Sequence, residues 1–249
     1  PGDIENLASI FKPDLSVITL VGSAHSAFVD VPKEKSSIAN HTKNTVIYDG
    51  DVRLNLRDKG LIYTEFVKLK GYKDLKTLVE LDGKVFFMNE IWGSGQIKDL
   101  NMALSVLEYL GINFNSVDIE KIQMPSGRMN FERIGKYFLV DDTYNASPES
   151  FLTAATTCAK FGNTIWILAP MKELNMDGVK EQLMDFFLRL KPKMVFTVEN
   201  DDFYPFGIPY DLDKFLNILN SNDVILVKGS RFYKMERIVK EIKEELKKL

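Results

Sequence analysis

The 249-residue sequence predicts an α/β protein whose two halves have different patterns. In the second half, short apolar runs alternate with amphipathic helical segments, which is typical of a mostly parallel sheet with helical crossovers. In the first half, similar elements are mixed with closely spaced strand candidates around Asp82-Gly83, which indicates antiparallel pairing. The segment 124–127 has the composition of a linker. We therefore place a domain boundary between residues 124 and 125.

The first half contains strand, turn and helix signals in succession. Leu15–Val21 and Thr45–Tyr48 are rich in β-branched residues and are predicted strands. Asp82-Gly83 has the composition of a two-residue hairpin turn. Leucines then recur at helical spacing until Gly111. The expected strands are 15–21, 45–48, 61–69, 75–81 and 84–89, and the expected helices are 97–110 and 117–122.

The second half has clearer helix boundaries. Ser147 is a favourable N-cap, and Pro148 and Glu149 suit the first helical turn. Gly162 ends the helix that begins there. The expected strands are 138–140, 164–168, 194–198 and 224–227, and the expected helices are 148–161, 177–190, 211–219 and 232–249.

Composition excludes several classes of function. The formal net charge of −3 provides no general basic surface, so we expect no nucleic-acid partner. Cys158 is the only cysteine, which excludes an intrachain disulfide and fits a reducing compartment. No apolar run approaches the ~20 residues of a membrane helix, and no signal peptide is visible. We expect a cytoplasmic protein without membrane insertion.

The most informative motif is the run 141–150, Asp-Asp-Thr-Tyr-Asn-Ala-Ser-Pro-Glu-Ser. It follows the apolar stretch Tyr137–Val140 and precedes a helix. In open α/β sheets, ligands bind at the carboxyl ends of the strands. A turn that only started a helix would need the cap but not the two acids, the aromatic residue and the amide. The motif therefore indicates a ligand site.

This motif resembles the Asp-Asp-Ser-Tyr-Asn-Ala-Asn-Pro signature of the Mur ligases. The closest type is MurF, the ligase that adds D-alanyl-D-alanine to UDP-N-acetylmuramoyl-tripeptide. Further segments follow the order of that family, namely Pro1–Ile4, Gly22–His25, Ser126–Arg128 and Leu226–Arg231. The resemblance implies a partial central ATPase domain over 1–124 and a Rossmann-like, mostly parallel ligase domain over 125–249.

The resemblance also implies roles for individual residues. His25 and Lys35 would be catalytic and support Mg²⁺, with Lys35 carbamylated in the family pattern Lys-x-Lys-x-x-Ile. The residues implied to border ATP are Asn101, Arg128, Asp142, Tyr144 and Asn145. The residues implied to hold the incoming dipeptide are Lys228, Ser230 and Arg231.

These roles are chemically reasonable. Carbon dioxide adds only to a neutral amine, so carbamylation of Lys35 requires a lowered pKa. Mg²⁺ prefers oxygen ligands, and guanidinium groups suit phosphate oxygens. A helix amino end with cations suits a carboxylate or a phosphate. Each role has a plain alternative: a surface or capping His25, a solvated turn at 33–38, a surface Arg128, a helix cap by Asp141 or Asp142, and a simple strand-to-helix turn at 228–231.

The sequence also departs from the family pattern. Family members carry Gly-x-His-Asn-x-x-Asn where this chain has 95–101, and only Asn101 keeps an adenine-reading position. Ile97 and Lys98 replace other residues there. Ala169-Pro170 stands where relatives have Gly-Asp, although Glu173-Leu174 matches.

The reaction implied by the resemblance needs ATP and Mg²⁺. The tripeptide carboxylate becomes an acyl phosphate, and the amine of D-alanyl-D-alanine then displaces phosphate. The 249 residues contain no Gly-x-x-Gly-Lys-[Ser/Thr] loop, and phosphoryl transfer depends on positioning. We therefore expect that these residues alone do not ligate. We also expect a monomer.

Several other functions stay open at this stage. They are a MurE-type ligase, a folylpolyglutamate-type ligase and a non-catalytic nucleotide-binding homologue. A dehydrogenase is disfavoured, because Gly93-Ser94-Gly95 lacks the third glycine of a dinucleotide loop. The ligase hypothesis depends on one expectation, that the turns at 141–150 and 228–231 face a common cleft.

Overall fold

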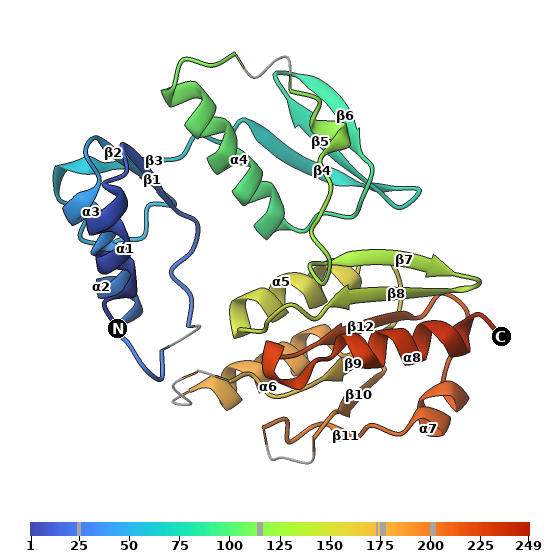
Figure 1. Cartoon of the computed structure of the whole chain (residues 1–249). Helices are drawn as coiled ribbons and strands as arrows, with labels where there is room; N and C mark the ends of the chain where they lie inside the picture. The colour runs from blue at the N-terminus through green and yellow to red at the C-terminus, as the bar shows by residue number, and fades with distance from the viewer. Residues whose placement is uncertain (24–25, 114–116, 173, 175–177, 200–202) are drawn as a thin grey trace. The chain divides into compact units, whose positions relative to one another are not determined.

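The computed structural model describes residues 1–23, 26–113, 117–172, 174, 178–199 and 203–249. The chain divides into two compact units, Pro1–Ile122 and Gln123–Leu249 (Figure 1). The division falls two residues before the boundary expected from the linker composition. The mixed α/β architecture that the sequence predicts is confirmed in both units.

The first unit contains two three-stranded sheets. The parallel sheet has the order β1-β2-β3, formed by Leu15–Ile18, Thr45–Tyr48 and Gly60–Ile62. The antiparallel sheet has the order β4-β5-β6, formed by Val67–Lys73, Lys76–Leu81 and Lys84–Met88. The helices are α1 (Asp3–Phe11), α2 (Val31–Ser36), α3 (Ile38–His41) and α4 (Ser94–Tyr109), with 3₁₀ turns η1 (Arg57–Lys59) and η3 (Ile119–Lys121).

The sequence prediction for this unit needs two corrections. The expected strand 61–69 is two strands in different sheets, because the backbone N–H of Thr64 turns to the hydroxyl of Ser105 on α4. The expected helix 117–122 is only the 3₁₀ turn η3. The hairpin turn at Asp82-Gly83 is confirmed, since both residues have left-handed φ angles of 49° and 73°.

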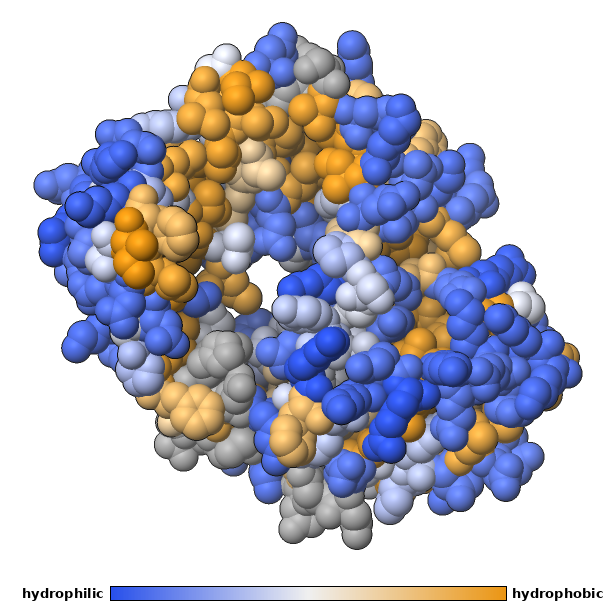
Figure 2. All heavy atoms as spheres, viewed as in Figure 1, coloured by the Kyte–Doolittle hydropathy of each residue, from blue (hydrophilic) through white to orange (hydrophobic). Residues whose placement is uncertain are grey.

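One helix of this unit exposes apolar side chains. Figure 2 shows hydrophobic surface over the part of the first unit that carries α1. Leu7, Ile10 and Phe11 of α1 are exposed, whereas Ala8 is buried. By contrast, the apolar side chains of Ile18, Val46 and Ala39, from the parallel sheet and α3, form a buried core.

The second unit is built on one six-stranded sheet with the order β11-β10-β9-β12-β8-β7. Only β7 is antiparallel to its neighbour. The strands are β7 (Asn130–Ile134), β8 (Tyr137–Asp142), β9 (Thr164–Leu168), β10 (Met194–Thr197), β11 (Ile208–Pro209) and β12 (Val224–Lys228). The helices are α5 (Pro148–Cys158), α6 (Val179–Leu190), α7 (Leu212–Asn217) and α8 (Glu236–Leu246), with the 3₁₀ turn η4 (Arg231–Tyr233).

Helices cover both faces of this sheet (Figure 1). On one face, Phe151 of α5 meets Trp166 of β9 edge to face, with ring centroids 4.9 Å apart. On the other face, Phe215 of α7 and Ile242 of α8 join the core with Ile225 of β12. Every residue of β9 and β12 is buried. Burial on both faces explains why these strands read as continuous apolar runs rather than alternating ones.

The predicted helix starts and strands of this unit are largely confirmed. Ser147 caps α5, because its hydroxyl accepts a hydrogen bond from the Ser150 N–H at 3.3 Å. The edge strands β7 and β11 were not predicted. The last helix begins at Glu236 rather than at residue 232, because η4 and the left-handed Lys234 intervene.

Gly162 lies where the chain leaves α5 and passes the segment before β12. A Cβ atom at this position would lie 2.2 Å from the backbone oxygen of Asn222. Gly162→Ala should therefore lower the free energy of unfolding of the second unit by about 1–3 kcal/mol or more. Urea denaturation followed by Trp166 fluorescence in a Trp92→Phe background measures this change.

Gly135→Ala is the control, because it changes the backbone conformational energy of a glycine without a steric clash. Gly135 has a φ of 57° and open space around its Cα, so its replacement should cost about 1 kcal/mol. A Gly162→Ala variant no less stable than Gly135→Ala would contradict the steric explanation.

Candidate functional site

The strand order places the two predicted ligand turns side by side. In the parallel pair of β12 and β8, Lys228 is in register with Asp142. In the antiparallel pair of β7 and β8, Asn130 is in register with Asp141. The beginning of β7 and the ends of β8 and β12 therefore meet at one edge of the sheet. The carboxyl ends of parallel strands are the usual position of ligands in such folds.

A buried ion pair joins the ends of β8 and β12. The Lys228 Nζ donates to the Asp142 Oδ2 at 2.5 Å and to the backbone oxygen of Asn145 at 3.0 Å. The other Asp142 oxygen accepts from the Met129 N–H at 3.1 Å. The Lys228 side chain is 2% exposed. A buried charge requires such partners, so this network fixes three loops relative to one another.

This network gives two predicted ligand residues a structural role. Asp142 was expected to border ATP and Lys228 to hold the incoming dipeptide, but each binds the other in this structure. Their contacts with a ligand stay predictions. The alternative that one of the acids caps α5 is wrong, because Ser147 is the cap and Asp141 accepts from the Thr143 hydroxyl at 2.6 Å.

Three exposed side chains surround this network. Tyr144 is 46% exposed. The Arg128 guanidinium carbon lies 4.0 Å from the ring centroid, and that of Arg231 lies 5.6 Å from it. Asn145 lies beside them, and its Oδ1 accepts from the Ala146 N–H at 2.9 Å. The structure thus brings together residues that the sequence analysis assigned to different ligands.

The turn after β12 is tightly packed. A Cβ at Gly229 would lie 2.7 Å from the Cβ of Ala169, so only glycine fits without a shift. Ser230 is buried, and its hydroxyl accepts from the Phe232 N–H at 3.5 Å. Ser230 therefore caps η4 here, and its contact with a peptide stays a prediction. Arg231 is the exposed cation of this turn.

Lys35 lies on α2 of the first unit, where its Nζ donates to the backbone oxygen of Leu20. Burial lowers the pKa of Lys35, and the nearby Lys98 acts in the same direction, whereas Asp49 opposes them. Lys98 and Asp49 form an ion pair of 2.9 Å. A lowered pKa is the condition that carbamylation requires, but the modification itself stays a prediction.

Asp49 and Lys98 were not predicted as neighbours of Lys35. One signal was available, because Asp49 follows directly after β2, at the carboxyl end of a parallel strand. Lys98 appeared only as a departure from the family pattern. Tertiary structure alone pairs it with Asp49, from a helix 49 residues further along the chain.

The metal site is not established by the described residues. His25 lies outside the part of the chain that the structure describes. Within the described part, no three His, Cys, Asp or Glu side chains are grouped to hold a metal ion. Lys35 alone does not form a Mg²⁺ site.

Asn101 has an internal role in the first unit. Its Oδ1 accepts from the Val67 N–H at 2.7 Å, and its Nδ2 donates to the Val67 oxygen at 2.9 Å. The side chain is buried, and its amide group makes with Val67 of β4 the two hydrogen bonds that a neighbouring strand would make. The adenine contact expected of Asn101 stays a prediction that this geometry does not support.

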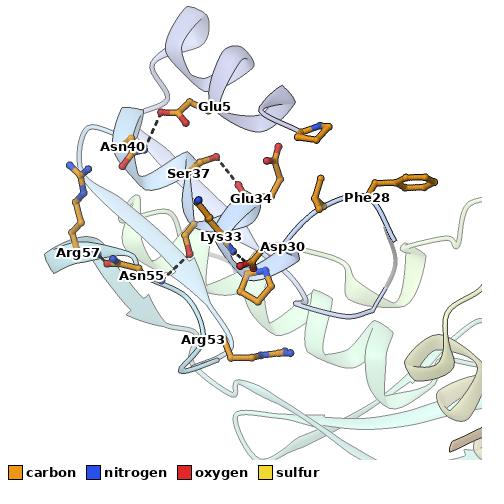
Figure 3. A pocket seen from close by; sticks show the side chains of 14 residues that line it. Glu5, Phe28, Asp30, Lys33, Glu34, Ser37, Asn40, Arg53, Asn55 and Arg57 are labelled. Carbon is orange, nitrogen blue, oxygen red and sulfur yellow. Dashed lines mark hydrogen bonds between the residues drawn. The ribbon is translucent and has the colours of Figure 1, made fainter. Parts of the chain in front are cut away.

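A hollow of about 760 Å³ lies beside α1 and α2 (Figure 3). Glu34 lies at its edge, where its Oε2 accepts from the Gly2 N–H at 2.9 Å and its Oε1 from the Ile4 N–H at 3.3 Å. The Gly2 hydrogen bond is the main reason that the pKa of Glu34 is lowered. The segment Pro1–Ile4 is therefore attached to the helix that carries Lys35.

Cys158 is buried, and burial raises the pKa of its thiol, so a structural role fits better than a reactive one.

Among the described helices, none combines the length and apolar character needed to cross a bilayer.

Comparisons with known proteins agree with the motif analysis. A curated UDP-N-acetylmuramoyl-tripeptide–D-alanyl-D-alanine ligase from Buchnera aphidicola is 24% identical, and the alignment covers 100% of this chain and 64% of the relative. The crystal structure of MurF from Thermotoga maritima in complex with ADP is 27% identical, with a TM-score of 0.84 over 100% of this chain and 66% of that protein. No family model matches the chain.

A second solved structure, MurF from Acinetobacter baumannii, is 19% identical with a TM-score of 0.79, and the match covers 98% of this chain and 62% of that protein. These matches confirm the predicted resemblance to Mur ligases of the MurF type. The chain spans about two thirds of the length of the relatives it matches.

Removing one partner of the buried ion pair should destabilise the second unit strongly. Lys228→Met leaves Asp142 buried without its cation, which typically costs about 3–5 kcal/mol. The double variant Asp142→Asn/Lys228→Met should recover part of this loss. Urea denaturation followed by Trp166 fluorescence in a Trp92→Phe background measures both.

Lys248→Met is the matched control, since Lys248 pairs with Glu245 on the surface of the same unit. Its unfolding midpoint should stay close to that of the parent. Equal midpoints for Lys228→Met and Lys248→Met would show that the buried pair does not join the strand ends.

The attachment of Pro1–Ile4 should depend on pH through Glu34. The pKa of Glu34 is lowered from its ordinary value of 4.5, so the ionised form stabilises the fold above that value. This contribution is lost as the pH falls through the lowered pKa. In Glu34→Gln, the amide protection of Ile4 in hydrogen exchange should be weaker at neutral pH and should no longer change through the acidic range. Protection identical to that of the parent at every pH would refute this role.

Proposed function

We propose that this chain supplies the nucleotide- and acceptor-binding part of an ATP-dependent ligase that joins D-alanyl-D-alanine to UDP-N-acetylmuramoyl-tripeptide. The observation that carries the proposal is the similarity to MurF along the whole chain, combined with the adjacent motif turns on β8 and β12. ATP and a divalent cation are the cofactors that this reaction needs.

The reaction has two steps. The tripeptide carboxylate accepts the γ-phosphate of ATP, which gives an acyl phosphate and ADP. The amine of D-alanyl-D-alanine then attacks the acyl carbon, loses a proton and displaces inorganic phosphate as the amide forms. Phosphoryl transfer is mainly a matter of positioning and charge neutralisation. Exposed cations next to a rigid strand edge are suited to both tasks.

At this edge of the sheet, exposed side chains suit ligand binding and buried side chains hold the turns in place. Arg128, Tyr144 and Arg231 are exposed and available to ligands, whereas Asp142 and Lys228 hold the turns that carry them. The amide nitrogen of Asn145 and the Tyr144 ring suit the border of a nucleotide. The lowered pKa of Lys35 supports its proposed modification in the first unit.

A non-catalytic nucleotide-binding homologue is the second candidate. Lys98 is paired with Asp49, and Asn101 is occupied by the backbone of Val67. Both residues lie in the segment where the family reads adenine, so this chain lacks a free side chain at these two positions. MurE-type and folylpolyglutamate-type ligases remain further alternatives that differ in the amine they add.

A complementation assay tests the proposal. The chain is joined to the part of the Thermotoga maritima MurF that it does not span, and phosphate release is measured with ATP, Mg²⁺ and UDP-N-acetylmuramoyl-tripeptide. We expect release with D-alanyl-D-alanine, and none with diaminopimelate or glutamate as the amine. The 249 residues alone should release no phosphate.

Arg128→Ala and Arg189→Ala provide a matched pair in this assay. Arg128 lies at the proposed site, whereas Arg189 pairs with Asp185 on α6. We expect Arg128→Ala to reduce the rate at least tenfold and Arg189→Ala to leave it unchanged. Phosphate release with no amine, or with every amine equally, would contradict the proposal.

A further inference from the structure

Two arginine side chains from distant parts of the chain meet at one aromatic ring. Arg128 lies in the loop before β7, Tyr144 in the turn after β8, and Arg231 begins η4 after β12. Because β7, β8 and β12 are neighbours in the sheet, their ends bring these residues together. Both guanidinium carbons lie within 6 Å of the Tyr144 ring centroid, at 4.0 Å and 5.6 Å. This is the range in which cations and aromatic rings attract each other.

We propose that Arg128 and Arg231 form a single phosphate-binding pair and that Tyr144 is the residue that positions both guanidinium groups. This inference rests on the proposed function and refines it. The sequence analysis assigned Arg128 to the nucleotide and Arg231 to the peptide. Their convergence on one ring assigns them to the same anionic group instead.

The charges at this edge support an anionic ligand. Within the described part of the chain, neither Arg128 nor Arg231 forms an ion pair with a carboxylate. Both Asp142 oxygens accept hydrogen bonds from Lys228 and Met129, so this acid is already occupied. Two like charges repel each other, and the ring attracts both without using their N–H donors. Those donors remain available for oxygen atoms of a ligand.

Backbone hydrogen bonds join the residue that carries the ring to the loop before β7. The Tyr144 N–H donates to the Gly127 oxygen at 2.9 Å, and the Gly127 N–H donates to the Asn130 Oδ1 at 2.6 Å. Gly127 has a φ of 73°, and a Cβ there would lie 3.2 Å from the Tyr144 nitrogen. The loop that carries Arg128 is therefore attached directly to the residue whose ring its side chain contacts.

A phosphate group matches this pair better than a carboxylate does. Two guanidinium groups carry two positive charges, whereas one carboxylate carries a single negative charge. A phosphate has further charge and more oxygen atoms, and guanidinium forks bind phosphate oxygens in pairs. Both cations can then be neutralised by one ligand group.

Binding of inorganic pyrophosphate to the complete chain tests this inference. Isothermal titration at constant ionic strength should show that pyrophosphate binds and that acetate does not. Arg128→Ala and Arg231→Ala should each weaken binding about tenfold or more, whereas Arg189→Ala should leave it unchanged. Pyrophosphate affinity unaffected by Arg231→Ala, acetate bound as tightly, or no binding at all would overturn the inference.

Two variants of Tyr144 test its positioning role. Tyr144→Phe keeps the ring and should retain most of the affinity, whereas Tyr144→Leu should weaken it several-fold. The chemical shifts of the Arg128 and Arg231 side-chain Nε–H protons should both change in Tyr144→Leu, because the ring current of Tyr144 is lost. They should stay nearly unchanged in Tyr144→Phe, which keeps the ring. Signals that do not move in Tyr144→Leu would contradict the role of Tyr144.

These measurements do not depend on ligation. Pyrophosphate binding that follows the expected pattern, together with a failed complementation assay, would contradict the proposed function and leave the phosphate site supported. Ligation that proceeds normally in Arg231→Ala would overturn the shared site and leave the proposed function intact.

Discussion

The buried ion pair between Asp142 and Lys228 is the interaction on which the candidate site depends. It joins the ends of two parallel strands and also binds the loop before β7 through the Met129 N–H. Burying these charges is costly, so each oxygen of Asp142 and the ammonium of Lys228 require partners. The network meets this requirement by holding three turns together, which leaves the neighbouring exposed side chains as the groups that can meet a ligand.

A second ion pair lies near the other end of β12, between the partly exposed Lys193 and the buried Asp223. Lys193 donates to Asp223 at 2.5 Å just before the strand begins. The exposed guanidinium pair of Arg128 and Arg231 lies at the opposite, carboxyl end of the strand, where parallel sheets bind ligands. An ion pair with a buried partner therefore does not mark a site by itself. The candidate site is inferred instead from the carboxyl ends of the parallel strands and from the exposed Arg128 and Arg231.

The fold of the second unit could be predicted well because its signals are local. Runs such as 164–168 and 224–228 are apolar throughout, since both faces of the sheet are covered, and Ser147 and Pro148 mark a helix start. β7 was missed because its residues Asn130–Ile134 alternate weakly and its partner alone makes it a strand. In the first unit, residues 61–69 form two strands because the Thr64 N–H donates to the hydroxyl of Ser105. Ser105 lies far away in the sequence, so no local pattern predicts this contact.

The family resemblance, the α/β class and the two motif turns follow from the sequence alone, because they depend on residue types at short spacing. Which residues bind each other follows from the tertiary structure. It paired Asp142 with Lys228 and Lys98 with Asp49, and it occupied Asn101 with the Val67 backbone. It also placed Arg128 and Arg231 at one ring. Such choices depend on strand order and burial, which bring distant segments together and set the cost of an unpaired charge.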